Sequence, residues 1–173
     1  PAISRQVSAL EQDVGVKLFA KPSQRDIVRN RIFSGEAIMS VWTGLENGLA
    51  RPDTIPNELA PTSQYGLQWP KWGQWYETGG QSGEPIDIPI ARELFDLFQA
   101  WLDAGETAER ERIWHRMLSI HAEQTFTIGV VNGVFQPIVI NKKLANVPKE
   151  GIFNWDPGAF IGIYRPETFW LRP

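Results

Sequence analysis

Two consecutive amphipathic segments, residues 88–103 and 106–122, constrain the fold of this chain more than any other feature of its sequence. In both segments apolar residues recur at the spacing that places them on one face of an α-helix. Those of the first are Ile90, Leu94, Leu97, Phe98 and Trp101, and those of the second are Ile113, Trp114, Met117 and Ile120. Gly105 separates the segments, so the pattern predicts two successive helices that each present an apolar inner face.

Length and composition are those of one folded domain. The 173 residues are enough for a real core, and 42% hydrophobic with 21% charged residues is typical of a globular chain. Because there is no cysteine, disulfides and thiolate metal sites are excluded. No stretch approaches the roughly 20 apolar residues of a membrane span. The start at Pro1 lacks the basic and apolar regions of a signal peptide, and it suggests a chain cut from something longer.

Shorter elements are expected on both sides of the helix pair. Residues 2–13 are predicted to form a helix that stops at Gly15, and residues 24–33 a second helix that ends at Ser34–Gly35. Apolar or alternating runs predict strands over residues 37–42, 125–131, 137–140 and 168–171. Prolines and glycines predict irregular structure over residues 45–84 and 146–166, and a long irregular segment in a compact domain is usually functional.

The most unusual number in the composition is eight tryptophans, beside nine phenylalanines and three tyrosines. Four aromatic residues fall within the eight positions Trp69–Tyr76. Their spacing fits neither a helix nor a strand cleanly, and Pro70 with Gly73 favours a folded-over loop. Two interpretations stay open. The rings either plug the loop into the core or line a cleft for sugar faces, apolar side chains or cationic groups.

No catalytic or metal site is predicted. His115 and His121 stand six apart, on different faces of one helix, without partners at metal-ligand spacing, and are expected at the surface or in helix packing. The chain has no Gly-x-Ser-x-Gly sequence, and the glycines at 79, 80 and 83 lack the strand, lysine and helix of a phosphate loop. Glycoside hydrolysis would need paired carboxylates. Solvation explains most of the candidates, which are Glu77, Glu84, Asp87, Asp96 and Asp103. No cofactor is predicted either.

The N-terminal end differs in charge from the rest. Residues 1–31 carry six Lys and Arg against three Asp and Glu, whereas residues 32–173 carry eleven against seventeen. On the first predicted helix, Ser4, Arg5 and Gln6 could touch phosphates and base edges, and a solvated helix face is the alternative.

Residues 1–20, PAISRQVSALEQDVGVKLFA, resemble the recognition helix and following turn of LysR-type transcription regulators. The similar features are Pro-Ala-x-Ser, a helix, and Val14–Phe19 in place of Leu-Gly-x-x-Leu-Phe. The resemblance implies DNA contacts by Ser4, Arg5 and Gln6. A DNA-binding transcription regulator is therefore the alternative function.

Residues 24–173 resemble the C-terminal part of the family 5 extracellular solute-binding proteins, the peptide, nickel and oligosaccharide receptors of ABC importers. The similar stretches, in order, are residues 35–44, 69–83, the helix pair 88–122 with its continuation to 123, then 128–131, 141–148 and 165–169. The resemblance implies an α/β fold in which residues 21–173 form part of the distal lobe, with the return segment, of the two-lobed periplasmic-binding-protein fold. The short N-terminal helix in residues 1–20 stands before it. The junction near residues 21–24 suggests a fusion, a misassembled gene or a truncated reading frame.

The same resemblance implies a non-catalytic protein, periplasmic or extracellular, that captures a peptide- or oligosaccharide-sized solute and delivers it to the membrane subunits of an importer. Self-association over exposed lobe edges stays open. Peptide-binding members have an aspartate for the ligand's amino group where this chain has Leu45, which favours sugar-like or other polar, uncharged ligands. The expected ligand-binding residues are Trp42, Thr43, Gly44, Leu45, Glu46, Asn47, Trp69, Trp72, Trp75 and Tyr76.

Overall fold

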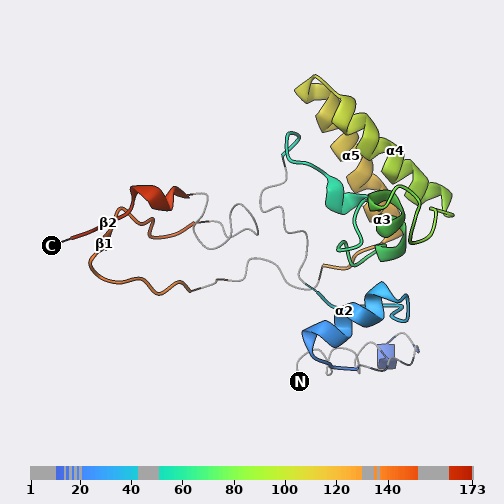
Figure 1. Cartoon of the computed structure of the whole chain (residues 1–173), viewed down its shortest axis with the longest axis horizontal. Coiled ribbons are helices and arrows are strands. Elements are labelled where there is room, and N and C mark those ends of the chain that lie inside the picture. The colour runs from blue at the N-terminus through green and yellow to red at the C-terminus, as the bar shows by residue number, and fades with distance from the viewer. Residues whose placement is uncertain are drawn as a thin grey trace. The chain divides into compact units, whose positions relative to one another are not determined.

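A computed structural model of the chain describes residues 11–13, 15, 17, 19, 21–42, 51–129, 135, 137–151 and 164–172. The helices and strands are α2 (Arg25–Phe33), η1 (Asn57–Leu59), α3 (Pro70–Glu77), α4 (Pro89–Asp103), α5 (Thr107–Gln124), β1 (Leu144–Ala145), η3 (Pro166–Thr168) and β2 (Trp170–Leu171), where η marks 3-10 helices (Figure 1). The chain divides into two compact units, residues 1–38 and 39–173.

The first unit contains α2, which begins and ends within a residue of the prediction. It closes with two backbone hydrogen bonds. The Gly35 N–H donates to the Ile32 carbonyl at 3.0 Å, and the Glu36 N–H donates to the Arg31 carbonyl at 3.0 Å. This pair of bonds requires a left-handed residue after the helix, and Gly35 has a φ of +80°. Gly15 likewise has a φ of +72° just after the helical residues 11–13, which confirms the predicted stop there.

In the second unit, α4 and α5 confirm the predicted helix pair, and α5 runs two residues beyond its predicted end. The helices lie side by side and antiparallel, since the turn of residues 104–106 joins them and Arg116 pairs with Glu93 across them at 2.6 Å (Figure 1). Beyond α5 the chain turns at Thr125, whose φ is +53°.

The core confirms the predicted apolar stripes. Leu94, Met117 and Ile120 have no exposed surface, and Ile90 and Leu97 lie at its half-buried margin. The buried residues of the core are Leu59, Ala60, Leu94, Phe98, Trp101, Ala104, Ile113, Trp114, Met117 and Ile120. Segment 59–60 thus closes the core from outside the helix pair, which two helices alone cannot complete.

The expectation of a loop over Trp69–Tyr76 is wrong, because Pro70–Glu77 forms α3. Proline is well tolerated at the first position of a helix, where no backbone N–H is needed, and Pro70 takes that place. Gly73 lies inside the helix because the chain passes against it. A Cβ atom there would lie 2.1 Å from the carbonyl carbon of Ser63. The region 45–84 therefore contains η1 and α3, where irregular structure was predicted.

The predicted strands are largely wrong. The described residues of 37–42, 125–131 and 137–140 form no strand, and β2 covers only Trp170–Leu171 of the run 168–171. β-branched residues favour a strand, but a strand exists only where a partner supplies its ladder of hydrogen bonds. In the described part of the chain that partnership is between β1 and β2, which are antiparallel with Leu144 opposite Leu171. The described residues are mostly helical, and a place in a two-lobed α/β fold stays a prediction.

Candidate ligand-binding hollow

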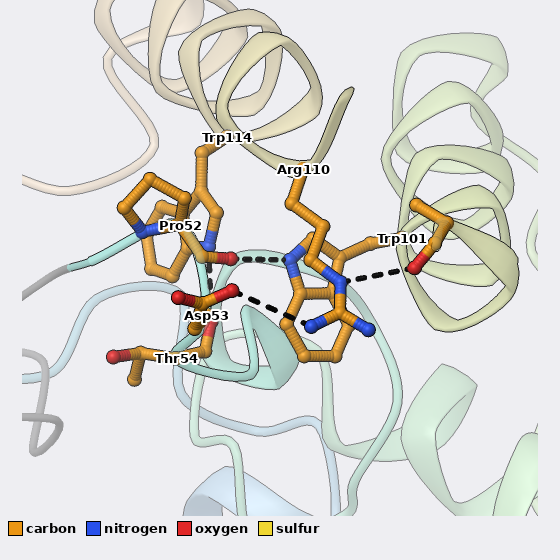
Figure 2. A network of polar contacts seen from close by, with 7 residues as sticks. Pro52, Asp53, Thr54, Trp101, Arg110 and Trp114 are labelled. Carbon is orange, nitrogen blue, oxygen red and sulfur yellow. Dashed lines mark hydrogen bonds and ion pairs between the residues drawn. The ribbon is translucent and has the colours of Figure 1, made fainter. Parts of the chain in front are cut away.

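Two buried tryptophans fix the chain before η1 to the helix pair. The Trp101 indole Nε1–H donates to the Pro52 carbonyl at 2.8 Å, and the Trp114 indole Nε1–H donates to the Thr54 carbonyl at 2.9 Å (Figure 2). Trp101 and Trp114 are only 7% and 5% exposed. We call Trp101, Trp114 and residues 52–54 the tryptophan clamp.

Arg110 lies over the tryptophan clamp (Figure 2). Its guanidinium carbon is 4.9 Å from the ring centre of Trp101, and its Nε–H donates to the Ala104 carbonyl at 3.1 Å. Asp53 approaches Arg110 at 3.5 Å, but its side chain is 64% exposed, so this ion pair adds little. The clamp is therefore a structural use of tryptophan, in which each indole N–H is satisfied by backbone.

The two histidines lie as predicted, one at the surface and one in helix packing. His115 is exposed and 3.8 Å from Glu111. His121 is partly buried, and its Nε2 donates to the Leu59 carbonyl at 2.8 Å. Burial lowers the pKa of His121, and the hydrogen bond to Leu59 opposes that shift only in part. In the described residues no group of three or more His, Cys, Asp and Glu is arranged to hold a metal ion.

Trp69 belongs to the core side of α3. Its ring lies 5.2 Å from the ring of Phe126, edge to face, and 5.8 Å from that of His121. It also stacks on Trp72 at 6.1 Å with an angle of 29° between the rings. For this residue the core-plugging interpretation holds, and Trp69 does not line the hollow described next.

The opposite side of α3 lines an open hollow with a volume of about 270 Å³. The aromatic residues at its surface are Trp75 and Tyr76, which are 37% and 40% exposed. Tyr76 meets Phe95 of α4 edge to face at 5.2 Å. The lining residues are Trp72, Trp75, Tyr76, Gly79, Gly80, Ile86, Arg92 and Phe95. We call this set the aromatic hollow.

Glycines shape the loop that borders the hollow. Gly80 has a φ of +85°, and a Cβ atom on it would lie 3.2 Å from Cζ2 of the Trp75 ring. Gly83 has a φ of +87°, and a Cβ atom there would lie 2.3 Å from the Lys71 carbonyl oxygen. The loop folds back onto α3, where the Glu84 N–H donates to that carbonyl at 3.1 Å. Glycine is therefore required at 80 and 83 for a close approach to α3.

A carboxylate holds the other side of α3. Glu77 accepts hydrogen bonds from the Ser63 Oγ–H at 2.7 Å and from the Gln64 N–H at 3.2 Å. This role is structural, since it fixes the turn that packs on Gly73. Among the acidic candidates weighed for hydrolysis, Glu77 is thus engaged with protein groups, and Glu84, Asp87, Asp96 and Asp103 are exposed.

The structure brings together three of the expected binding residues, Trp72, Trp75 and Tyr76. Trp42 is 38% exposed and is not part of the lining. Thr43, Gly44, Leu45, Glu46, Asn47 and the expected DNA contacts Ser4, Arg5 and Gln6 lie outside the described residues.

Sequence reasoning missed Arg92 and Phe95. The signal was present in α4, because an arginine and a phenylalanine stand three apart on the side away from the core stripe. An aromatic residue off the buried face of an amphipathic helix indicates a second contact surface.

Comparisons with protein-family models, with curated proteins and with solved structures find no match to this chain. In the described residues, no helix combines the length and apolar character needed to cross a membrane. The geometry of the aromatic hollow therefore carries the functional argument.

Proposed function

We propose that this chain is a non-catalytic ligand-binding polypeptide and that the aromatic hollow is its binding surface. One observation carries the proposal. Trp72, Trp75, Tyr76 and Phe95 from two helices line one hollow, and Trp75 and Tyr76 keep more than a third of their surface exposed. Single exposed aromatic residues, such as Trp170, are common at protein surfaces, whereas aromatic rings that gather around one hollow are typical of ligand-binding sites.

The chemistry of the hollow suits a ring with polar edges. An aromatic face packs against the C–H face of a sugar ring, while the sugar hydroxyls stay toward water. In the part of the chain that the structure describes, the indole N–H groups of Trp72 and Trp75 donate to no protein acceptor, in contrast to those of the tryptophan clamp. They are therefore available as donors to a ligand. A sugar-like solute can stack on the rings and accept hydrogen bonds from the indole N–H groups, whereas an apolar solute can only stack.

The hollow is small for a complete binding site. Ligand pockets usually have volumes of roughly 300–1,000 Å³ and bury most of the ligand. A hollow of about 270 Å³ that is open to water contacts one face of a sugar ring. We expect a dissociation constant on the order of 1 mM, which corresponds to about 4 kcal/mol of binding free energy.

The resemblance of residues 24–173 to solute-binding proteins of ABC importers leads to the same class of function. In that proposal the chain is a fragment of the substrate-binding component of an importer, located in the periplasm or outside the cell. Its partners are an oligosaccharide- or peptide-sized solute and the membrane subunits of the importer. A second lobe would cover the open side of the hollow and raise the affinity.

Titration with cellotetraose and with a neutral tetrapeptide, followed by tryptophan fluorescence, tests the proposal. We expect a saturable change with cellotetraose that disappears in Trp75→Ala. The matched control is Trp170→Ala, which removes an exposed tryptophan that does not line the hollow. This control should bind as the parent does. A flat titration with both ligands, or an equal loss of binding in both variants, would overturn the proposal.

A further inference from the structure

Among the residues that the structure describes, Arg92 is the one charged residue that lines the aromatic hollow. It lies in α4, with its guanidinium carbon 5.9 Å from the ring centre of Phe95, whose ring meets that of Tyr76. A cation therefore stands at the edge of the surface on which a ligand ring would stack. A neutral ligand would leave this charge unused.

The guanidinium of Arg92 already makes two contacts in the absence of a ligand. Its Nη2–H donates to the Ile86 carbonyl at 3.2 Å, and Phe95 lies beneath it. A cation above an aromatic face gains electrostatic attraction from the ring. A pre-positioned side chain loses less conformational entropy on binding, so more of the interaction appears as affinity.

Most of the hydrogen-bonding capacity of Arg92 is unused in the described structure. Guanidinium carries five N–H donors, and only one bond, to Ile86, is formed. No acidic side chain of the described residues lies within ion-pair distance of Arg92, and the adjacent Glu93 is paired with Arg116 at 2.6 Å. The remaining donors can take a carboxylate in the two-pronged geometry that favours arginine.

Building on the proposed function, we infer that the aromatic hollow selects ligands in which a carboxylate stands beside a stackable ring, as in an acidic sugar. The ring packs on Trp75 and Tyr76, and the carboxylate binds Arg92. The net charge of the chain is −3, which disfavours ligands with many negative charges. One carboxylate against one guanidinium is the match that this surface offers, so Arg92 is a specificity-determining residue.

A matched pair of probes tests this inference. Cellotetraose and the tetrasaccharide whose terminal glucose is replaced by glucuronic acid differ only in one carboxylate. At low ionic strength the acidic probe should bind the parent chain about tenfold more tightly, and the advantage should shrink in high salt. In Arg92→Gln the two probes should bind with equal affinity, because the carboxylate that distinguishes them has lost its charged partner. Arg92→Lys should keep part of the advantage, because it keeps the charge but loses the planar fork.

The outcomes separate this inference from the proposed function. Equal binding of the two probes to the parent chain would overturn the role of Arg92 while leaving the hollow as a sugar-binding surface. Failure of both probes to bind would overturn the proposed function and this inference together. The salt dependence is measured on the parent chain, so it decides the matter even if an Arg92 variant fails to fold. Circular dichroism of each variant gives the fold control.

Discussion

The tryptophan clamp and the aromatic hollow use tryptophan in opposite ways. In the clamp, Trp101 and Trp114 are buried, and each indole N–H is bonded to a backbone carbonyl of residues 52–54. In the hollow, Trp75 of α3 is 37% exposed. The same residue type therefore fixes the chain in one place and offers a surface in the other.

The difference lies in what the backbone around each ring does. At the tryptophan clamp, residues 52–54 are irregular, so their carbonyls have no partner within a helix. Buried carbonyls need hydrogen-bond donors, and the two indole N–H groups supply them. Around the hollow the backbone groups of α3 are already paired within the helix, and the loop after it folds back onto α3 through Gly83. Those elements need no indole donor, so the rings of the hollow are available for ligand.

The largest effect is expected when one tryptophan ring is removed from the clamp and, separately, one from the hollow. Trp114→Ala should lower the free energy of unfolding by about 3–5 kcal/mol, because it leaves a cavity and removes the indole hydrogen bond to the Thr54 carbonyl. Trp75→Ala should lower it by about 1 kcal/mol or less. Urea unfolding monitored by circular dichroism measures both changes. Equal losses would show that the hollow is as structural as the clamp.

Substitution of Gly73 should have the next largest effect on the free energy of unfolding, and it tests how closely α3, which lines the hollow, is packed. Gly73→Ala should cost about 2–3 kcal/mol of unfolding free energy, since the new methyl group meets the backbone of Ser63 at 2.1 Å and neither side can yield easily. Gly105→Ala is the matched control, because a Cβ atom there meets nothing within 4 Å. Thermal unfolding of the two variants compares them directly. A Gly73→Ala variant as stable as its control would contradict the close packing of α3.

How far the sequence predicts this molecule depends on whether a feature is local. The stripe of α4 repeats over about three turns and that of α5 over about two, and the core confirms both. Gly73 favours a loop when the sequence is considered locally, but it lies inside α3. A glycine is needed there because the backbone of Ser63 passes against the helix, and a local sequence pattern does not contain that contact. The run 137–140 has strand composition, yet strand formation depends on a partner elsewhere in the chain.

The residues of the candidate site also divide into those that the sequence predicts and those that depend on tertiary packing. Trp72, Trp75 and Tyr76 stand out by composition alone, and the structure brings them into one hollow. The separation of Trp69, which faces the core, follows from the helical turn of α3 and not from the aromatic count. Arg92 and Phe95 join the hollow because α3 packs near the start of α4, and that approach is tertiary.

The pH dependence of the free energy of unfolding, to which His121 contributes, should be a smaller effect than the loss of Trp114 or the substitution of Gly73. Burial lowers the pKa of His121 below 6.5, so the unfolded chain takes up a proton more readily than the folded one. The free energy of unfolding should therefore fall as the pH drops through and below 6.5. His121→Gln keeps a donor for the Leu59 carbonyl and does not titrate, so its stability should change less over this range. Urea unfolding at several pH values makes the comparison, and parallel curves for parent and variant would contradict the prediction.

The smallest effect is expected at the edge of the clamp. Asp53→Asn should change the free energy of unfolding by less than about 0.5 kcal/mol, because the Asp53–Arg110 pair is long and mostly exposed. Chemical unfolding at low and high salt measures it. A loss as large as that of a buried residue would mean that the clamp depends on this ion pair and not on its two indole bonds.

The indole N–H resonances compare the clamp and the hollow in one measurement. They test most directly whether the indoles of the hollow, and not those of the clamp, bind ligand. In ¹⁵N-labelled protein, with signals assigned by single Trp→Phe variants, the glucuronic acid tetrasaccharide is titrated into the parent chain. We expect saturable shifts of the Trp72 and Trp75 signals, with the Trp101 and Trp114 signals unmoved because their donors are already bonded to backbone. Shifts confined to Trp101 and Trp114, or no shift in any of the four, would contradict it.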